Sequence, residues 1–277
     1  MYSMAEEFNK NIDIHRITQR YGKRLLSINL SAQLQVVKEL ARMDTQPAHK
    51  ALIHIVTDDR LKVKTRKSGL ESLVALGINL SGINLSDADF SEANLPGAML
   101  TGARLSRINF QGADLRGAFF QDANLEGADF SLADLTDAAF CSSDLYQANL
   151  WDANLTRADL SAAYAREAVF KHALVRDVQL HSAVISLAEF EDNDLSHVDL
   201  RHAKLTEAIF NRVDLHEANL EGAKLVMAEF NRVDFTGAIL RNAEMRGATF
   251  LECNFSGMDI NGADLEATEI QNENNII

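Results

Sequence analysis

A large apolar residue occupies every fifth position of the chain from Leu80 to Ile270, and Ala165 is the only exception among 39 positions. The residue two positions earlier is Ala in 27 of these 39 units, and the residue between the two is often Asp or Asn. No insertion interrupts the series. Because this period is short and constant, it restricts the architecture of most of the chain.

A five-residue period excludes the two common regular structures. In an α-helix five residues advance by about 500°, so the apolar positions would spread around the whole helix surface. In a long strand side chains alternate with period two, so every second unit would face the wrong side. The remaining arrangement is a short extended segment followed by a corner. In such a unit Ala123 and Leu125 point inward, whereas Asn124, Glu126 and Gly127 point outward.

The phenylalanines indicate how many units close one coil. At the nine central positions from 90 to 250 in steps of 20, eight residues are Phe and the other is Leu150. Only four of the other 30 central positions carry Phe. The sequence therefore predicts four units per coil, about ten coils, and a ladder of Phe rings stacked at the strand spacing of about 4.8 Å.

These repeats, with units such as Ala-Asn-Leu at 123–125 and Ala-Asp-Phe at 128–130, resemble the pentapeptide-repeat family. The resemblance covers residues 78–270 and implies a mostly β fold, the right-handed quadrilateral β-helix. The handedness follows from the resemblance alone. The resemblance also points to gyrase-protecting members of that family, which imitate the shape of DNA and dimerise through their C-terminal ends.

Residues 1–77 lack the five-residue period and are predicted to form an α-helical N-terminal domain. Apolar residues at helical spacing predict three helices, of which the first is capped by Ser31 and the second starts at Pro47. The third is expected to stop at Gly77. The segment 47–77 also resembles one HEAT repeat. Because an open solenoid end exposes apolar side chains and unpaired backbone groups, we expect this domain to cap the first coil.

The other end of the predicted solenoid carries only the tail of residues 271–277. This tail is too short for a helical cap. We therefore expect the last coil either to stay open or to be buried in a homodimer through the C-terminal coil.

Charge is divided unevenly along the chain. Residues 1–76 hold 13 Lys or Arg and 8 Asp or Glu, a net charge of +5, whereas residues 77–277 hold 14 and 32, a net charge of −18. Part of this acidity belongs to the repeat, and Asp194, Asp214 and Asp234 are predicted to form an acidic ladder on successive coils. The rod is therefore not expected to bind nucleic acid directly, because like charges repel. Its acidity fits either a solvated surface or a duplex-like ligand.

The sequence contains no recognisable catalytic constellation. The eight His are scattered, and His181 and His202 are expected to be diagonal neighbours on adjacent coils. Cys141 and Cys253 fall in no metal or redox spacing, and no Gly-rich phosphate loop or nucleophile elbow is present. We predict no catalytic residue, no metal, no cofactor and no enzymatic activity.

The lack of long apolar segments and the predicted convex shape favour a binding protein over membrane proteins and enzymes. No apolar run reaches 18 residues and the first 20 residues lack a signal-peptide core, so we predict no membrane contact and a cytoplasmic location. A convex, filled rod offers no cleft for chemistry. The leading hypothesis is a non-enzymatic protein-binding rod or scaffold. The alternative is an acidic, DNA-mimicking inhibitor or protector of DNA gyrase or of another DNA-binding protein.

Outward positions are mostly polar, with one group of apolar and aromatic exceptions in the middle coils. Trp and Tyr are typical anchors of protein interfaces. We therefore predict a contact site for a protein partner whose identity the sequence does not give. The candidate residues are Tyr146, Trp151, Tyr164, Val169, Leu174 and Val184.

Overall fold

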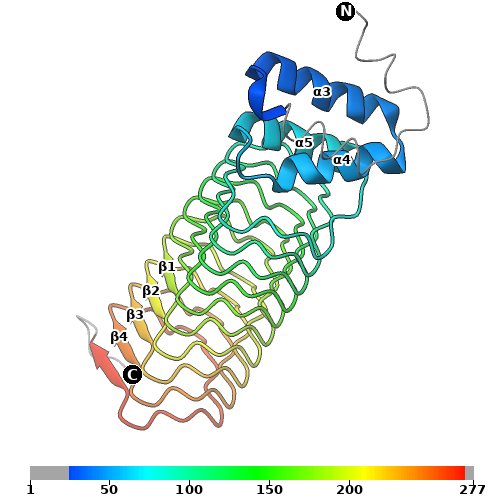
Figure 1. The fold of residues 1–277 in the computed structure, drawn as a ribbon. Coiled ribbons are helices and arrows are strands. Elements are labelled where there is room, and N and C mark those ends of the chain that lie inside the picture. Colours follow the sequence, from blue (N-terminus) through cyan, green and yellow to red (C-terminus); the bar gives the residue numbers. More distant parts are fainter. Residues whose placement is uncertain (1–24, 272–277) are drawn as a thin grey trace, which may run out of the picture.

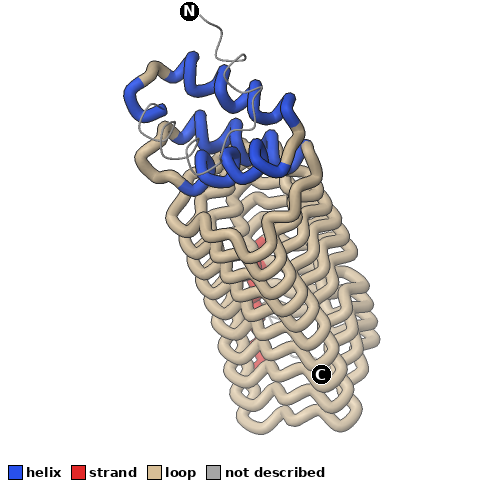
Figure 2. Tube along the Cα trace, turned by 45° about the vertical axis from the view of Figure 1, so that its right-hand side comes forward, coloured by secondary structure: helices blue, strands red, loops and turns tan. Residues whose placement is uncertain are grey.

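The computed structural model describes residues 25–271, and it shows helices stacked on one end of a long coil (Figure 1). Helices α3 (Leu30–Met43), α4 (Gln46–Thr57) and α5 (Val63–Ala75) precede the solenoid. Figure 2 shows that the helices are confined to that end. The parts of the predicted N-terminal domain and C-terminal tail at residues 1–24 and 272–277 lie outside the described residues.

Helices α3 and α4 begin at residues that satisfy their first free backbone N–H groups or tolerate the lack of one, whereas the first residue before α5, Lys62, provides no side-chain cap. The Asn29 side chain caps α3 and accepts a hydrogen bond from the Ala32 amide at 3.0 Å. The prediction that Ser31 is the cap is therefore wrong, because Ser31 lies inside the first turn. Helix α4 begins one residue before Pro47, whose missing N–H costs nothing in a first turn.

The end of α5 leads directly into the first coil. Gly77 has a φ of 65°, the left-handed conformation that glycine adopts without a Cβ clash. The Ile78 amide then donates back to the Leu73 carbonyl at 3.0 Å, which fixes the direction in which the chain leaves the helix.

The solenoid has a register of twenty residues. Parallel bridges run from the pair Asn84 and Arg104 to the pair Glu244 and Asp264. Toward the C-terminal end the bridges lengthen into one parallel sheet in chain order, formed by β1 (Glu189–Glu191), β2 (Ile209–Asn211), β3 (Glu229–Asn231), β4 (Thr249–Leu251) and β5 (Glu269–Gln271). This register confirms a β-solenoid with four five-residue units per coil.

The interior contains the alanines and the central Leu and Phe residues. Phe170, Phe190 and Phe210 stack with ring centroids 4.8 and 4.9 Å apart and planes 4° from parallel. Toward the N-terminal end the ladder is looser, and the Phe90 and Phe110 rings lie 6.4 Å apart at 31°. The predicted Phe ladder is therefore confirmed, and its most regular part follows the gap at Leu150.

The polar residues of each unit have local structural roles. The Asp129 carboxylate accepts a hydrogen bond from the Ser131 amide at 2.9 Å, a contact that recurs in many units and favours Asp or Asn before the central residue. The second corner residue adopts a positive φ, as in Gly112 at 64° and Leu132 at 61°. Its amide donates to the next coil, since the Gly112 amide reaches the Ser131 carbonyl at 2.8 Å.

Helix α5 supplies hydrogen-bond partners to the first coil. The Glu71 carboxylate accepts from the Asn94 amide at 3.1 Å, and the Lys67 ammonium donates to the Ser91 carbonyl. In later coils the equivalent amides and carbonyls bond to the neighbouring coil. The Arg66 guanidinium lies 5.7 Å from the centre of the Phe90 ring and so covers the first ring of the ladder.

The opposite end has no such cover among the described residues. The central residues Ile260, Leu265 and Ile270 are 37%, 40% and 37% exposed. The same positions are buried in the coils before them. The last coil therefore presents an apolar end surface.

Candidate interaction surfaces

The residue before each central position points outward, and these residues form four columns, one on each face of the rod. We name the faces in chain order. The tyrosine face is the column of every twentieth residue from 84 to 264, which includes Tyr164. The phenylalanine face runs from 89 to 269 over the Phe ladder, the aspartate face from 94 to 254, and the Phe119 face from 99 to 259.

The structure places the predicted patch residues on three faces and two corners. Tyr164 and Val184 are direct neighbours in the column of the tyrosine face. Val169 belongs to the phenylalanine face and Leu174 to the aspartate face. Trp151 lies on the corner between those two faces. The sixth residue, Tyr146, lies on the corner that follows the tyrosine face. The candidates therefore form two separate groups, one on and beside the tyrosine face and the other around the corner that carries Trp151.

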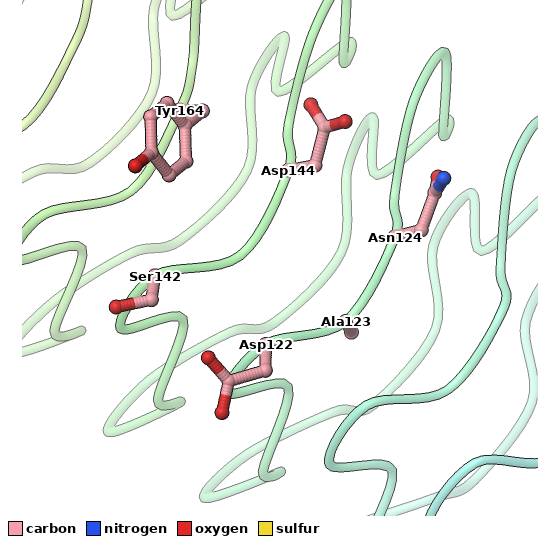
Figure 3. Close-up of a pocket in the computed structure, with 6 residues that line it drawn as sticks. All are labelled: Asp122, Ala123, Asn124, Ser142, Asp144 and Tyr164. Atoms are coloured by element: carbon pink, nitrogen blue, oxygen red, sulfur yellow. The ribbon is translucent and has the colours of Figure 1, made fainter.

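The first group surrounds Tyr164, whose side chain is 56% exposed. It borders an open hollow that also includes the carboxylates of Asp122 and Asp144 (Figure 3). Figure 3 shows these side chains on successive coils, with the Tyr164 ring beyond Asp144. Two carboxylates beside an aromatic ring suit the ammonium or guanidinium group of a basic side chain.

The second group, which we call the tryptophan corner, consists of Leu132, Trp151 and Leu174. They are 51%, 41% and 62% exposed. The Leu132 amide donates to the Trp151 carbonyl at 2.9 Å, so these two residues lie on adjacent coils of the same corner. Leu174 and Val169 flank the corner on the next coil. Leu132 was missed from the sequence, although an apolar residue at a second corner position, where Gly or a polar residue is usual, is itself a signal.

The three aspartates of the acidic ladder lie on successive coils of the aspartate face. Bridges join Asp194 to Asp214 and Asp214 to Asp234. Each carboxylate accepts a hydrogen bond from the amide two residues later, at 2.8 to 3.1 Å. The Ser196 hydroxyl, 2.6 Å away, holds the pKa of Asp194 below its ordinary value, so that carboxylate is ionised at neutral pH. Local donors thus offset part of the repulsion within the ladder.

Ion pairs between coils neutralise part of the acidity at the corners. Arg107 pairs with Asp87 and Arg157 with Asp137, each at 2.7 Å and each across one coil step. Exposed pairs of this kind contribute little to stability. They matter more for the surface potential, because they interleave positive charge with the acidic columns.

The described residues offer no evident catalytic or metal site. The rings of His181 and His202 lie 6.0 Å apart, as expected for adjacent coils. Between residues 25 and 271 no group of three or more His, Cys, Asp or Glu side chains is arranged to hold a metal ion. Burial and the nearby Asp159 carboxylate raise the pKa of Cys141 to about 11, so this thiol is protonated at neutral pH and weakly nucleophilic.

Within the described part of the chain, no helix combines the length and apolarity that a membrane span requires. The helices are short, and the longest described helix, α3, has 14 residues.

Comparison with a family model and with solved structures identifies similar proteins. The family model for pentapeptide repeats matches in eight copies, within residues 77–107, 108–145, 133–171, 143–181, 194–226 and 228–266. HetL from the cyanobacterium Nostoc sp. strain PCC 7120, a protein involved in heterocyst differentiation regulation, is 31% identical, with 69% of this chain and 88% of HetL covered and a TM-score of 0.42. A comparison with curated protein sequences gives no significant match.

Two further solved structures show lower coverage or lower identity. Rfr23 from the cyanobacterium Cyanothece 51142 is 31% identical over 34% of this chain and 63% of its own, with a TM-score of 0.32. QnrB1, a plasmid-mediated fluoroquinolone resistance protein, is 22% identical over 69% of this chain and 91% of its own, with a TM-score of 0.36.

Proposed function

This chain belongs to the pentapeptide-repeat proteins, and on that premise we propose that it is a non-enzymatic rod whose tryptophan corner binds a partner protein. The observation that carries the proposal is the exposure of Leu132, Trp151 and Leu174 together on a surface that is otherwise largely polar. Exposed apolar groups with a Trp anchor are typical of protein interfaces. Buried Ala, Leu and Phe side chains fill the interior of the described coils, and this filled interior supports binding over catalysis.

The test compares proteins captured by the full-length chain and by two variants. Trp151→Ala removes the anchor of the tryptophan corner, and Phe119→Ala removes an exposed aromatic ring from a different face. A partner of the corner should bind the wild type and Phe119→Ala but bind Trp151→Ala about 30-fold more weakly, the effect of losing about 2 kcal/mol. Equal capture by all three proteins would contradict the proposal.

Fluorescence gives an independent readout, because Trp151 is the only Trp of the chain. In the dilute protein its emission should lie far to the red and be quenched readily by acrylamide. A captured partner, once purified, should shift the emission to the blue and protect it from quenching.

The alternative function is an acidic ligand of DNA gyrase or of another DNA-binding protein. It is favoured by the acidic ladder and by the columns of three faces, which contain no Lys or Arg between residues 79 and 269. A supercoiling assay with purified gyrase tests it. Inhibition or protection that weakens with salt and with Asp214→Asn, but not with Trp151→Ala, would favour this alternative over the tryptophan corner.

The open C-terminal coil is a proposed surface for a homodimer. Ile260, Leu265 and Ile270 are apolar there, and a second copy would bury them as further coils do elsewhere. If this dimer forms, Leu265→Glu should convert it to a monomer in sedimentation experiments. If the C-terminal coil stays open instead, the substitution should not change the sedimentation of the protein. We place the protein in the cytoplasm, a proposal supported by the Cys141 thiol, which forms no disulfide within the described residues.

A further inference from the structure

We propose that the tyrosine face is self-complementary and binds the same face of a second copy, with the two rods antiparallel. This contact differs from the tryptophan corner and from the C-terminal coil. It does not depend on either.

The column of the tyrosine face changes character along the rod. Its middle is uncharged, with Tyr164 followed by Val184. Toward the N-terminal end lies Asp144, and toward the C-terminal end lie Lys204 and Lys224. No other face carries a Lys or Arg in its column between residues 79 and 269, so the opposition of charge across an apolar centre is specific to this face.

The pattern is antisymmetric about a point between Tyr164 and Val184. In an antiparallel dimer with its two-fold axis at that point, each residue faces the one equally far beyond the axis. The central pair is Tyr164 and Val184 of the second copy. One coil beyond that pair Asp144 meets Lys204 of the second copy, and three coils beyond it Arg104 meets Glu244 of the second copy.

The position between these two contacts also fits. Two coils beyond the central pair, Asn124 meets Lys224 of the second copy. Asp122 and Glu126 lie on the corners either side of Asn124, and both are exposed. Each contact occurs twice because the interface is isologous.

Several of these charges lack ion-pair partners within the described residues. Between residues 25 and 271 the Asp144 carboxylate accepts a hydrogen bond only from the Tyr146 backbone amide, at 3.1 Å, and no salt bridge involves Arg104 or Lys204. Lys224 pairs with Glu244 at 3.2 Å. This contrasts with the corners, where Arg107 and Arg157 each pair with an Asp on the adjacent coil. The column thus keeps charges available for a second chain.

A parallel arrangement in register would place Lys204 against Lys204 and Asp144 against Asp144, so like-charge repulsion selects the antiparallel one. Along one rod the proposed interface extends from Arg104 to Glu244, which is seven coil steps, or about 34 Å at about 4.8 Å per step. One narrow sheet face buries less area than an obligate interface does. We therefore expect a reversible dimer with a Kd on the order of micromolar that weakens as salt is added.

The test is a charge exchange in the full-length protein, measured by sedimentation velocity at about 1–300 µM, concentrations that bracket the expected Kd. All variants carry Leu265→Glu, so that the C-terminal coil contributes no association. In the Asp144→Lys homodimer the introduced lysine would face Lys204 of the other copy, at both symmetric contacts. In the Lys204→Glu homodimer the introduced glutamate would face Asp144 in the same way. Each variant alone should self-associate at least tenfold more weakly than the Leu265→Glu parent.

An equimolar mixture of the two variants should restore association to within about threefold of the parent. In the mixed dimer both contacts again join a lysine of one copy to a carboxylate of the other. Arg176→Glu is the matched control, since it makes the same charge change on the corner between the aspartate and Phe119 faces and should leave association unchanged. Circular dichroism verifies that each variant is folded.

Three results would overturn the proposal. The first is a parent that stays monomeric throughout this concentration range. The second is a mixture no more associated than the single variants. The third is a control as weak as Lys204→Glu, which would indicate that net charge alone governs association.

Discussion

The two ends of the rod are built from the same five-residue unit but have different surroundings. At the N-terminal end Leu85 and Phe90 are buried, and α5 provides partners to first-coil groups through Glu71 and Lys67. At the other end the equivalent central residues of the last described coil are exposed. The difference teaches that a unit is stabilised by what stacks on it, since each coil contacts only its neighbours.

Removing the helical end should have the largest effect on this comparison. Deleting residues 1–76 leaves two open ends, because the first coil loses the cover of α5. The Phe90 ring is then exposed and the Asn94 backbone amide loses its acceptor, Glu71. We expect the truncated rod to aggregate or oligomerise in size-exclusion chromatography with light scattering. A soluble monomer with the thermal stability of the full chain would mean that the helices do not cap the rod.

Ring removal should distinguish a central coil from the open end. Phe190→Ala deletes a fully buried ring between two stacked neighbours and should cost about 3–5 kcal/mol of unfolding free energy. Ile270→Ala, at the exposed end, should cost below about 1 kcal/mol. Urea denaturation measures both. Similar costs at the two sites would contradict the distinction between stacked and open coils.

A single hydrogen bond tests the contact between α5 and the first coil. Glu71→Ala leaves the Asn94 amide without its acceptor and should lower the free energy of unfolding by about 1 kcal/mol. Glu266→Ala, in the open coil, is the control and should change it by less than about 0.5 kcal/mol. If the control costs as much as Glu71→Ala, the carboxylate at Glu71 has no special role.

Acid should affect both ends alike and only slightly. The Arg116 guanidinium holds the pKa of Asp114 below its ordinary value, and the Asn261 amide with Arg241 does the same for Asp259 in the last coil. A lowered folded-state pKa contributes stability above the unfolded value of about 4 and loses it as pH falls through the folded value. Melting temperatures should therefore be flat from about pH 8 to 5 and decline only below about 4. A fall near about pH 6 would instead implicate the histidines.

The sequence was sufficient to predict the coil and its filling but not the contacts between different parts of the chain. The twenty-residue spacing of Phe identifies the register, and that register places Asp194 beside Asp214 without any structure. The interaction of Glu71 with Asn94 could not be predicted, because the five-residue period holds only within the coils and does not tell how a helix packs on them.

The candidate surfaces were predictable in part for the same reason. Tyr164 and Trp151 stand out at outward positions, but their separation onto a face and a corner requires the path of the coil. The complementarity of Asp144 and Lys204 becomes visible only when residues are compared in columns rather than along the chain.

Hydrogen exchange measured by mass spectrometry tests the central claim most directly, because it reports the opening of each coil separately. In dilute protein, amides of the first coil (residues 78–97) should exchange at least tenfold more slowly than those of the last described coil (residues 252–271), and the middle coils should be slowest. Equal protection at both ends, or faster exchange in the first coil, would contradict the account.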